Sequence, residues 1–423
     1  MKSRRSSSFA LATLLVLPVA ACAVQAAPFS ESTGGQKSRD QIADSDDPQS
    51  LLPGASTRLR DNISADDLHK KFGTSDATIP YPDTYWPFVD DGIDAKWNGS
   101  GTKSPLEKYV SVFNAADAAA LSSAQAWEKA NHGSGLPGVQ GWYGHCPGWT
   151  AAAMMNAPIQ HAVLAKSDGA GGVTSCSEGD EGCIKFEIGD VNALMAEIYV
   201  DARSRFIGNR CDTKPSDIKR DAYGRIVRNG SGCQGLNPGS LVIVLGTQMK
   251  SKKKAMAIDA QNDFNTDQIW NQPAYRYEVN RYEAVTAAEA ANLVAHGTKT
   301  GDLTGYKWND NAKGFVLVDL ALSWVSERGA NTSVVSGADS TRTTRMVAVL
   351  ELDGDSANSA TKIIGGEYID DASSGADRLT VPPFVWIASD AGPEDLGTWV
   401  NGNHHNPYVK PSLVKKLVEM GQR

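Results

Sequence analysis

The sequence predicts an α+β protein in which a helical N-terminal region precedes a β-rich C-terminal part. Three observations predict this class. Apolar residues recur at helical spacing before residue 206, and from residue 240 onward they alternate as in strands. The composition, with 41% hydrophobic and 21% charged residues, is that of an ordinary globular protein. A chain of 423 residues can form two or three domains with a large buried core.

The first 26 residues are predicted to be a signal peptide. They have a basic start, an apolar stretch too short to span a bilayer, and small residues suited to cleavage after Ala26. The segment VAAC also has the form of a lipoprotein signal, in which Cys22 would carry the lipid. The protein is therefore expected to be exported, either periplasmic or extracellular, with membrane contact only through a lipid on Cys22.

The helical region has readable boundaries. Residues 27–78 are polar and rich in Ser, Asp and Gly, so a disordered linker or pro-segment is expected there. Residues 104–133 open with Ser-Pro and end in Gly, which mark the start and end of a helix. A short helix is expected after Cys146, and an amphipathic helix is expected in residues 186–206.

Strands are expected from residue 241 onward. LVIVLGTQM and KAMAIDAQ would form a hairpin that turns at Lys250 and Ser251, followed by a strand in AYRYEVNRYEAVT. In this hairpin, Val242 would pair with Asp259, and directly paired residues share a face of the sheet. Beyond residue 300 the strands dominate, as in GFVLVDLALSWVSE, RTTRMVAVLELDGD and TKIIGGEYI.

The charge of the chain argues against a nucleic-acid partner. The formal net charge is −8, whereas binding to a phosphate backbone needs positive charge. The basic run KSKKK at residues 250–254 lies between two apolar segments and is interpreted as a solvated turn.

The cysteines predict two disulfides and one free thiol. Cys22 leaves with the signal peptide or carries a lipid, so five of the six cysteines remain, an odd number in an oxidising compartment. Two pairs bracket short polar loops and are expected to form local disulfides. These are Cys176 with Cys183 and Cys211 with Cys233. Cys146 is then the free thiol.

The surroundings of Cys146 suit a nucleophile. Pro147 is favourable at the first position of a helix, so GHCPGWTAAAMM places Cys146 at a helix N-terminus. There the helix dipole and free amides stabilise a thiolate, as in papain-type enzymes. The local pattern leaves a second interpretation open, in which Cys146 is a small buried thiol packed between aromatic side chains.

Several segments resemble a known family. DQIWNQPAYRYEV is similar to the Trp-Asn-Gln-Pro segment of the elicitor-type transglutaminases, which are secreted enzymes of oomycetes and bacteria. Further blocks resemble the family in the expected order across residues 80–410. They are YPDTYWPFVDDGIDAKW, GWYGHCPGW, GLNPGSLVIVL, LELDG with IIGGEY, and PPFVWIA. The resemblance implies a papain-like core, with a catalytic region in residues 79–300 and a β-rich region of the same unit in residues 301–423.

The resemblance also implies an activity and a site. Family members join glutamine side chains to lysines with a Cys nucleophile, a His base and an acidic residue, and water in place of lysine gives deamidation. Cys146 and Asp259 are the expected catalytic residues. Trp142, Trp149, Trp270 and Asn271 are expected to contact the substrate.

The chain departs from the family pattern at the expected base. The family tends to have a histidine where this chain has Val242, so activity is expected to be impaired. No other histidine lies in a strand before Asp259. The remaining options after Cys146 are His161, His296, His404 and His405, with His145 beside it. The alternatives are a non-catalytic relative that acts as a binding or elicitor-type surface protein and, less well supported, a papain-like peptidase.

The sequence contains no complete metal-binding motif. The resemblance allows calcium dependence, but no cofactor is certain. DFNTD offers alternating oxygen ligands at Asp263, Asn265 and Asp267, without the Gly and the final Glu of an EF-hand loop. The group of Asp90, Asp91 and Asp94 is no stronger, and polar turns explain both segments.

Overall fold

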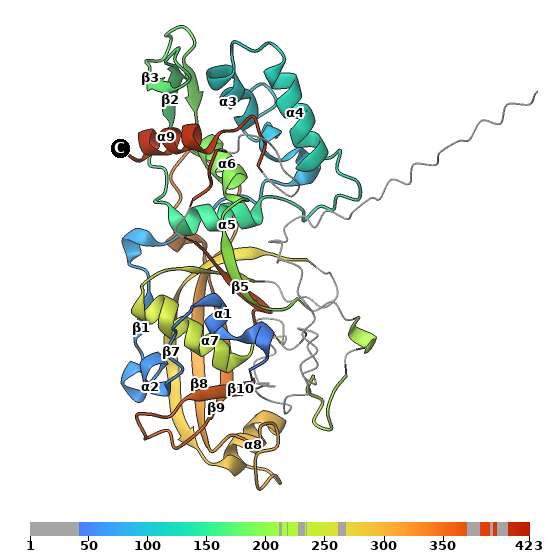
Figure 1. The fold of residues 1–423 in the computed structure, drawn as a ribbon, viewed down its shortest axis with the longest axis vertical. Coiled ribbons are helices and arrows are strands. Elements are labelled where there is room, and N and C mark those ends of the chain that lie inside the picture. Colours follow the sequence, from blue (N-terminus) through green and yellow to red (C-terminus); the bar gives the residue numbers. More distant parts are fainter. Residues whose placement is uncertain are drawn as a thin grey trace, which may run out of the picture.

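The computed structural model describes two lobes stacked along the long axis of the molecule (Figure 1). The helical lobe contains residues 81–200 and 405–423, and the sheet lobe contains most of the rest. All structural statements below refer to the described residues. These are 42–210, 214–217, 219–226, 233, 235–260, 268–369, 381–389, 392–395 and 405–423.

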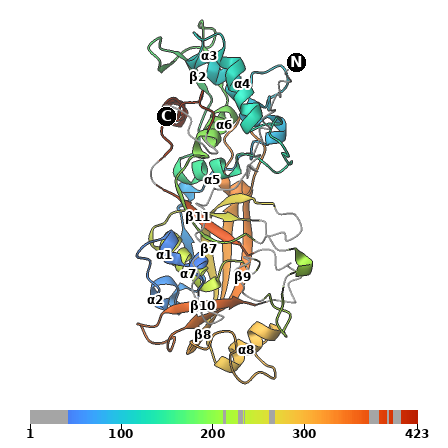
Figure 2. The same ribbon diagram turned by 45° about the vertical axis from the view of Figure 1, so that its right-hand side comes forward.

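An antiparallel sheet forms the sheet lobe. In the described residues its strand order is β10-β9-β8-β7-β6-β11-β5, and β1 adds to β7 beside β6. Figure 2 shows the long strands β7, β8 and β9 running down this lobe. The strands are β1 (Lys71–Gly73), β5 (Ser204–Gly208), β6 (Met256–Asp259), β7 (Asn271–Val285), β8 (Gly314–Val325), β9 (Thr341–Leu352), β10 (Ile363–Tyr368) and β11 (Phe384–Ala388).

The C-terminal strands confirm the sequence prediction. β8 and β9 pair without a break from Gly314 opposite Leu352 to Val325 opposite Thr341. Both are rich in β-branched residues, which pack well on a pleated surface. Helix α8 (Ala287–His296) covers one end of this pair through Leu293, which packs with Leu317 and Val349.

Helices dominate the other lobe, so the predicted α+β class is confirmed. The predicted helix 104–133 is two helices, separated by a turn at residues 114–119. Ser104 caps the first of them, because its side chain accepts from Glu107 N at 3.0 Å. The helices are α3 (Pro105–Phe113), α4 (Ala120–Asn131), α5 (Cys146–Met155), α6 (Ile188–Tyr199) and α9 (Pro411–Gln422). A small sheet of β2 (Val163–Ser167), β3 (Val173–Ser175) and β4 (Ile184–Phe186) lies beside them.

Two hydrophobic cores meet at strands β6 and β11. On β11, Trp386 packs into the core of the helical lobe, whereas its neighbour Val385 packs into the core of the sheet lobe. On β6, Ala257 and Ile258 divide in the same way. Since successive side chains of a strand point to opposite faces, these two strands connect the cores of both lobes.

The predicted hairpin around residue 250 is wrong. Residues Pro238–Val244 form helix α7, and Leu245–Ser251 continue it as a π-helix. Asn237 caps α7 by accepting from Gly239 N at 2.8 Å, and Pro238 suits the first helical position. Val242 therefore does not pair with Asp259.

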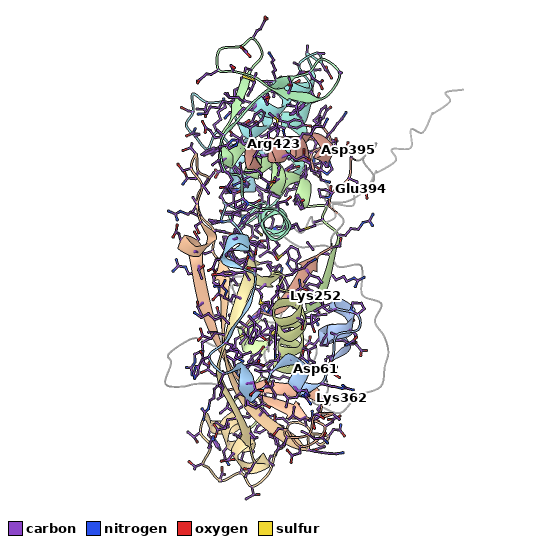
Figure 3. All side chains as sticks on the ribbon, turned by 90° about the vertical axis from the view of Figure 1, so that its left-hand side faces the viewer. Asp61, Lys252, Lys362, Glu394, Asp395 and Arg423 are labelled. Carbon is purple, nitrogen blue, oxygen red and sulfur yellow. A yellow bond between two sulfur atoms is a disulfide. The ribbon has the colours of Figure 1, made fainter. Side chains whose placement is uncertain are left out.

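The segment before residue 79 is ordered where it is described, contrary to the predicted disorder. Residues 42–78 contain α1 (Pro48–Leu51), α2 (Leu59–Asn62) and β1, together with short 3-10 turns. Leu51 and Ile63 are fully buried in the core of the sheet lobe, and a β-bridge joins Arg58 to Lys362. Figure 3 labels Asp61 of α2 and Lys362, the residue bridged to Arg58, on the sheet lobe.

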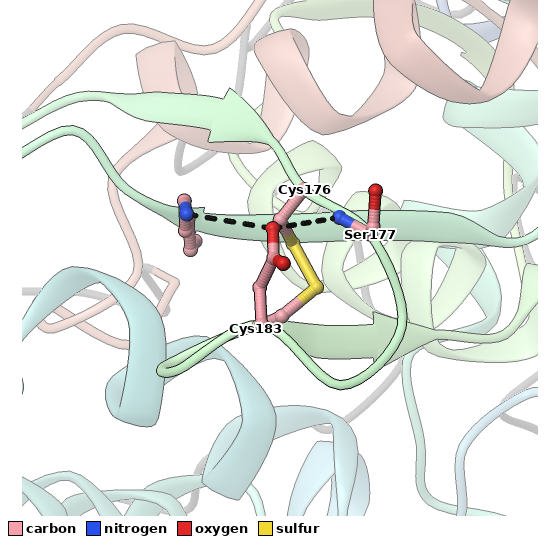
Figure 4. The surroundings of a disulfide bond; sticks show 5 residues. Cys176, Ser177 and Cys183 are labelled. Carbon is pink, nitrogen blue, oxygen red and sulfur yellow. Dashed lines mark hydrogen bonds and ion pairs between the residues drawn. A yellow bond between two sulfur atoms is a disulfide. The ribbon is translucent and has the colours of Figure 1, made fainter.

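The disulfide predictions are partly confirmed. Cys176 and Cys183 form a disulfide beside a tight turn, in which Ser177 N donates to Asp180 at 3.0 Å (Figure 4). Cys233 is disulfide-bonded, whereas Cys211, its expected partner, lies outside the described residues. Among the described cysteines Cys146 is the one not in a disulfide. Cys22 also lies outside the described residues.

Candidate active site

Cys146 lies at the junction of the two lobes, as the first residue of α5. This helix contacts β6, β7 and β11 of the sheet lobe and α6 of its own lobe. The unpaired amides and the dipole at a helix N-terminus stabilise a thiolate there. The Cys146 side chain is buried, so a substrate must reach it through a narrow approach.

The close packing of α5 on α6 depends on Gly148. A Cβ atom on this residue would lie 1.9 Å from the carbonyl oxygen of Ala196, far inside van der Waals contact. The glycine in CPGW therefore lets the two helices approach, and the alanines that follow it fill the same interface. This packing holds the first turn of α5, and with it Cys146, in one position.

Asn271 provides the side chain that contacts the thiol. Its Nδ2 lies 3.6 Å from Cys146 Sγ. The indole N–H of Trp386 donates to Asn271 Oδ1 at 2.7 Å, which turns the amide so that its N–H groups face the sulfur. Thr150 of α5 donates to the carbonyl of Asn271 at 2.8 Å and joins the helix to the strand. An amide donor in this place can stabilise negative charge on the sulfur or on an oxygen bound to the attacked carbon.

Asp259 lies beside Asn271 on the neighbouring strand. The two residues are direct partners in the β6–β7 ladder, and such partners share a face. The buried carboxylate of Asp259 accepts from the backbone N–H of Trp270 at 2.9 Å. Asp259 thus holds the backbone at Trp270, the residue before Asn271, whose side chain contacts the thiol.

Two half-buried aromatic residues lie near the thiol. Trp270 packs edge-on against Tyr85 with ring centroids 5.3 Å apart. The carbonyl of Tyr85 accepts from the backbone N–H of His145, and the carbonyl of Ile269 lies 4.0 Å from Cys146 Sγ. These contacts place the paired rings of Tyr85 and Trp270 beside the segments that carry Cys146 and Asn271. Tyr85 was not predicted as a site residue, although it lies in the family-like block YPDTYWPFVDDGIDAKW.

The other predicted substrate contacts differ in exposure. Trp142 is half-buried and donates to Gln140 at 2.7 Å, so its ring is partly accessible. Trp149 is fully buried in the core of the helical lobe, and its indole N–H donates to the carbonyl of Tyr81 at 3.2 Å. A substrate cannot reach Trp149 in this conformation, so the structure assigns that residue to packing.

The side-chain contacts of His145, His161, His296 and His405 are with groups other than the Cys146 thiol. His161 and His296 are exposed, and His405 is buried against Asp201. The ring of His145 turns into the helical lobe, where it lies against Phe88 and His132. His404 lies outside the described residues.

A buried polar cluster contains His145 and was not predicted from the sequence. It consists of Glu128, His132, His145 and Glu197. Burial lowers the pKa of His145. Burial beside Glu197 raises the pKa of Glu128 well above its usual value. Burial alone would raise the pKa of Glu197 too, but the neighbouring His132 and His145 lower it to about 2. One feature of the sequence could have indicated this cluster, namely that Glu128 and His132 are four residues apart at the end of one helix.

The described residues do not form an oxygen-rich site of the kind that calcium prefers. Calcium takes six to eight oxygen ligands, whereas the polar cluster offers two imidazoles. Asp91 accepts from Ser134 N at 2.7 Å, and Asp94 accepts from Ser104 Oγ at 2.7 Å, so both carboxylates have hydrogen-bond donors within the protein. The DFNTD residues Asp263, Asn265 and Asp267 lie outside the described residues. No described helix has the length and apolar character needed to cross a membrane.

Comparisons with known proteins identify a similar fold and a matching family. The fold is similar to the crystal structure of the GP42 transglutaminase from Phytophthora sojae, with a TM-score of 0.59 and 20% sequence identity. The match covers 85% of this chain and 93% of that chain. No curated protein matches in sequence. The profile of the transglutaminase elicitor family matches residues 122–400, which include Cys146, Asp259, Trp270 and Asn271. The chain therefore belongs to the transglutaminase elicitor family.

Proposed function

We propose that the protein is an exported protein-glutamine γ-glutamyltransferase that acts through a thioester on Cys146. The observation that carries this proposal is the contact between Cys146, at the start of α5, and the oriented amide of Asn271. An activated cysteine beside an amide donor is an arrangement suited to acyl transfer. The packing of the Cys146 helix against an antiparallel sheet also supports a papain-like core.

The reaction follows from these groups. The Cys146 thiolate attacks the carboxamide carbon of a glutamine side chain, and negative charge develops on the carboxamide oxygen. The Asn271 amide donates to that oxygen. Collapse breaks the carbon–nitrogen bond, and the leaving nitrogen takes up a proton and departs as ammonia. A lysine amine then attacks the thioester, loses a proton and releases the thiolate. Attack by water instead gives deamidation.

We assign the acidic position of the site to Asp259. Its hydrogen bond to Trp270 N holds the segment that carries Asn271, so its role is to position that amide. We assign no described histidine as the general base, because no contact between a described histidine ring and the Cys146 sulfur is observed, and the rings of His132 and His145 lie against Glu128 and Glu197. Tyr85 and Trp270 are the aromatic walls against which the glutamine side chain would lie. Protein substrates with Gln and Lys side chains follow from this chemistry.

Export rests on the first 26 residues, which have a basic start, a short apolar stretch and small residues before the cleavage position. The disulfide between Cys176 and Cys183 supports an oxidising compartment, since such bonds persist there.

Incorporation of a fluorescent primary amine into a glutamine-rich protein tests the proposal. Ammonia release, measured in parallel, separates amine transfer from deamidation. The matched control is Cys146→Ser, which keeps the shape of the site and removes the strong nucleophile. Equal rates for the two chains, with circular dichroism showing both folded, would favour a non-catalytic binding protein. Cleavage of the test protein, abolished by Cys146→Ser, would instead indicate a peptidase.

A further inference from the structure

We infer that the polar cluster of Glu128, His132, His145 and Glu197 is a structural site for one divalent transition-metal ion of the zinc type. One potential ligand atom from each side chain lies within 4.8 Å of all the others. The side chains come from the end of α4, the residue before α5, and α6. An ion bound here would join three consecutive helices of the helical lobe.

The distances fit a tetrahedral site. A zinc ion about 2.1 Å from each ligand keeps neighbouring ligand atoms roughly 3.4 Å apart. His145 Nε2 lies 3.1 Å from a carboxylate oxygen of Glu197 and 3.6 Å from one of Glu128. His132 Nδ1 lies 3.3 Å from the other oxygen of Glu197. These three distances are close to the tetrahedral value, and they involve both carboxylate oxygens of Glu197.

Unsatisfied polar atoms are an independent observation that points to a ligand. His132 Nδ1, both ring nitrogens of His145 and Glu197 Oε2 are buried and make no hydrogen bond. The exposed fraction is 5% for His132 and 0% for His145 and Glu197. Buried polar groups are nearly always satisfied, so atoms that converge without hydrogen-bond geometry call for a partner. A metal ion bound at their centre supplies that partner.

Hydrogen-bond donors around the cluster hold its carboxylates in place, as the groups around metal ligands do in known metal sites. Asn406 donates to both of them, through its backbone N–H to Glu197 and through Nδ2 to Glu128 at 3.0 Å. Ile93 N donates to Glu128 at 3.2 Å. Gly92 closes the remaining side, since a Cβ atom there would lie 2.6 Å from Glu128 Oε1 and 3.2 Å from His145 Nε2. Such partners orient ligands and are part of the site.

The donor set selects the metal. Two imidazoles and two carboxylates suit zinc, whereas calcium prefers oxygen ligands and magnesium retains water. A divalent ion also neutralises two carboxylates, which matters in a buried site. Four protein ligands leave no position open for substrate, so the ion would be structural and would fix the start of α5. This inference does not depend on the proposed activity.

Metal binding is tested on the folded chain carrying Cys146→Ala, so that the thiol cannot bind the ion. The chain is freed of metal with a chelator and titrated with Co²⁺, whose visible absorption reports tetrahedral coordination, and then with Zn²⁺ as competitor. We expect about one ion per chain and a rise in unfolding temperature with Zn²⁺.

Matched variants separate this cluster from other sites. His132→Gln and, as a second variant should the first misfold, Glu128→Gln should lose the tetrahedral Co²⁺ spectrum and the Zn²⁺-dependent rise. His296→Gln, which removes an exposed histidine paired with Asp302, should keep both. Absence of the tetrahedral spectrum in the folded parent chain would overturn the inference, as would an unchanged spectrum in folded His132→Gln.

Discussion

The side-chain amide of Asn271 lies 3.6 Å from the sulfur of Cys146, and the indole of Trp386 fixes its orientation. The two residues are 125 positions apart in the chain and come from different lobes. Their contact joins the start of a helix to the start of a strand. The proposed chemistry depends on this contact, and the first prediction tests it.

Replacing Asn271 by alanine should lower kcat for amine incorporation on the order of 10²–10³-fold, because a donor to the developing oxyanion is lost. Trp386→Phe should cause a smaller loss, since the amide remains but is no longer held. The assay is steady-state incorporation of a fluorescent amine. A folded Asn271→Ala chain with unchanged kcat would contradict the assignment.

Placing a histidine at Val242 should not create a general base. Val242 is buried in α7, which packs against β9 and β10 rather than against α5. A buried imidazole without a partner costs about 1–3 kcal/mol in the free energy of unfolding. Val242→His should therefore unfold at lower denaturant and show no gain in amine transfer over the parent chain. A gain that Cys146→Ser abolishes would restore the idea of a missing base at this position.

Gly148→Ala should destabilise the protein by about 1–3 kcal/mol or more, because the added methyl group meets the carbonyl of Ala196. It should also displace Cys146 and slow amine transfer. Gly141→Ala is the matched control, since a Cβ at that position meets nothing within 4 Å. Equal unfolding midpoints for the two variants would show that α5 and α6 can separate without cost.

Two carboxyls with raised pKa values should make the free energy of unfolding fall as the pH rises from about 4 to 9. Burial raises the pKa of Asp83 to about 7 and that of Glu327 to about 8. Both carboxyls bind protons more tightly in the folded chain. Their contribution to the free energy of unfolding is therefore complete below the unfolded pKa of about 4. It is lost as the pH rises through about 7–8, where the folded-state carboxyls lose their protons. The expected loss is on the order of several kcal/mol.

The double variant Asp83→Asn with Glu327→Gln isolates this effect. Denaturant unfolding should show a difference between variant and parent that shifts in favour of the variant as the pH rises from 5 to 9. A difference that stays constant across this range would mean that neither group changes its protonation.

Alkylation in denaturant without reductant should label Cys146 and leave Cys176, Cys183 and Cys233 unlabelled. The described disulfides protect those three sulfurs. Peptide mapping by mass spectrometry reads out the labelled positions. A label on Cys233 would show that its disulfide does not form in the folded protein.

Local signals predicted much of the fold. The Ser104 cap and the alternation in β8 and β9 are short-range features that tertiary packing did not change. The segment from Leu241 to Leu245 was misassigned as a strand because it is buried on all sides. An apolar run of this length has no periodicity that separates a buried helix from a strand.

The candidate site was partly predictable for a related reason. Cys146 stands out through its helix start, and Asn271 lies in the Trp-Asn-Gln-Pro segment. Asp259 was predicted from a hairpin pairing with Val242 that does not form, because Val242 lies in helix α7. The polar cluster has no such pattern, because Glu128 and Glu197 belong to different helices and meet only in the folded chain. Long-range contacts of this kind follow from how helices pack, which one sequence does not specify.

The two-lobe origin of the site determines when the nucleophile becomes reactive. Cys146 is synthesised well before Asn271, and the amide reaches the sulfur only after β7 has paired with β6 and docked on α5. A nascent or half-folded chain therefore carries an ordinary cysteine. Under the proposed function, activation would therefore be a late event in folding, and the thiol would stay latent until these contacts between the lobes form.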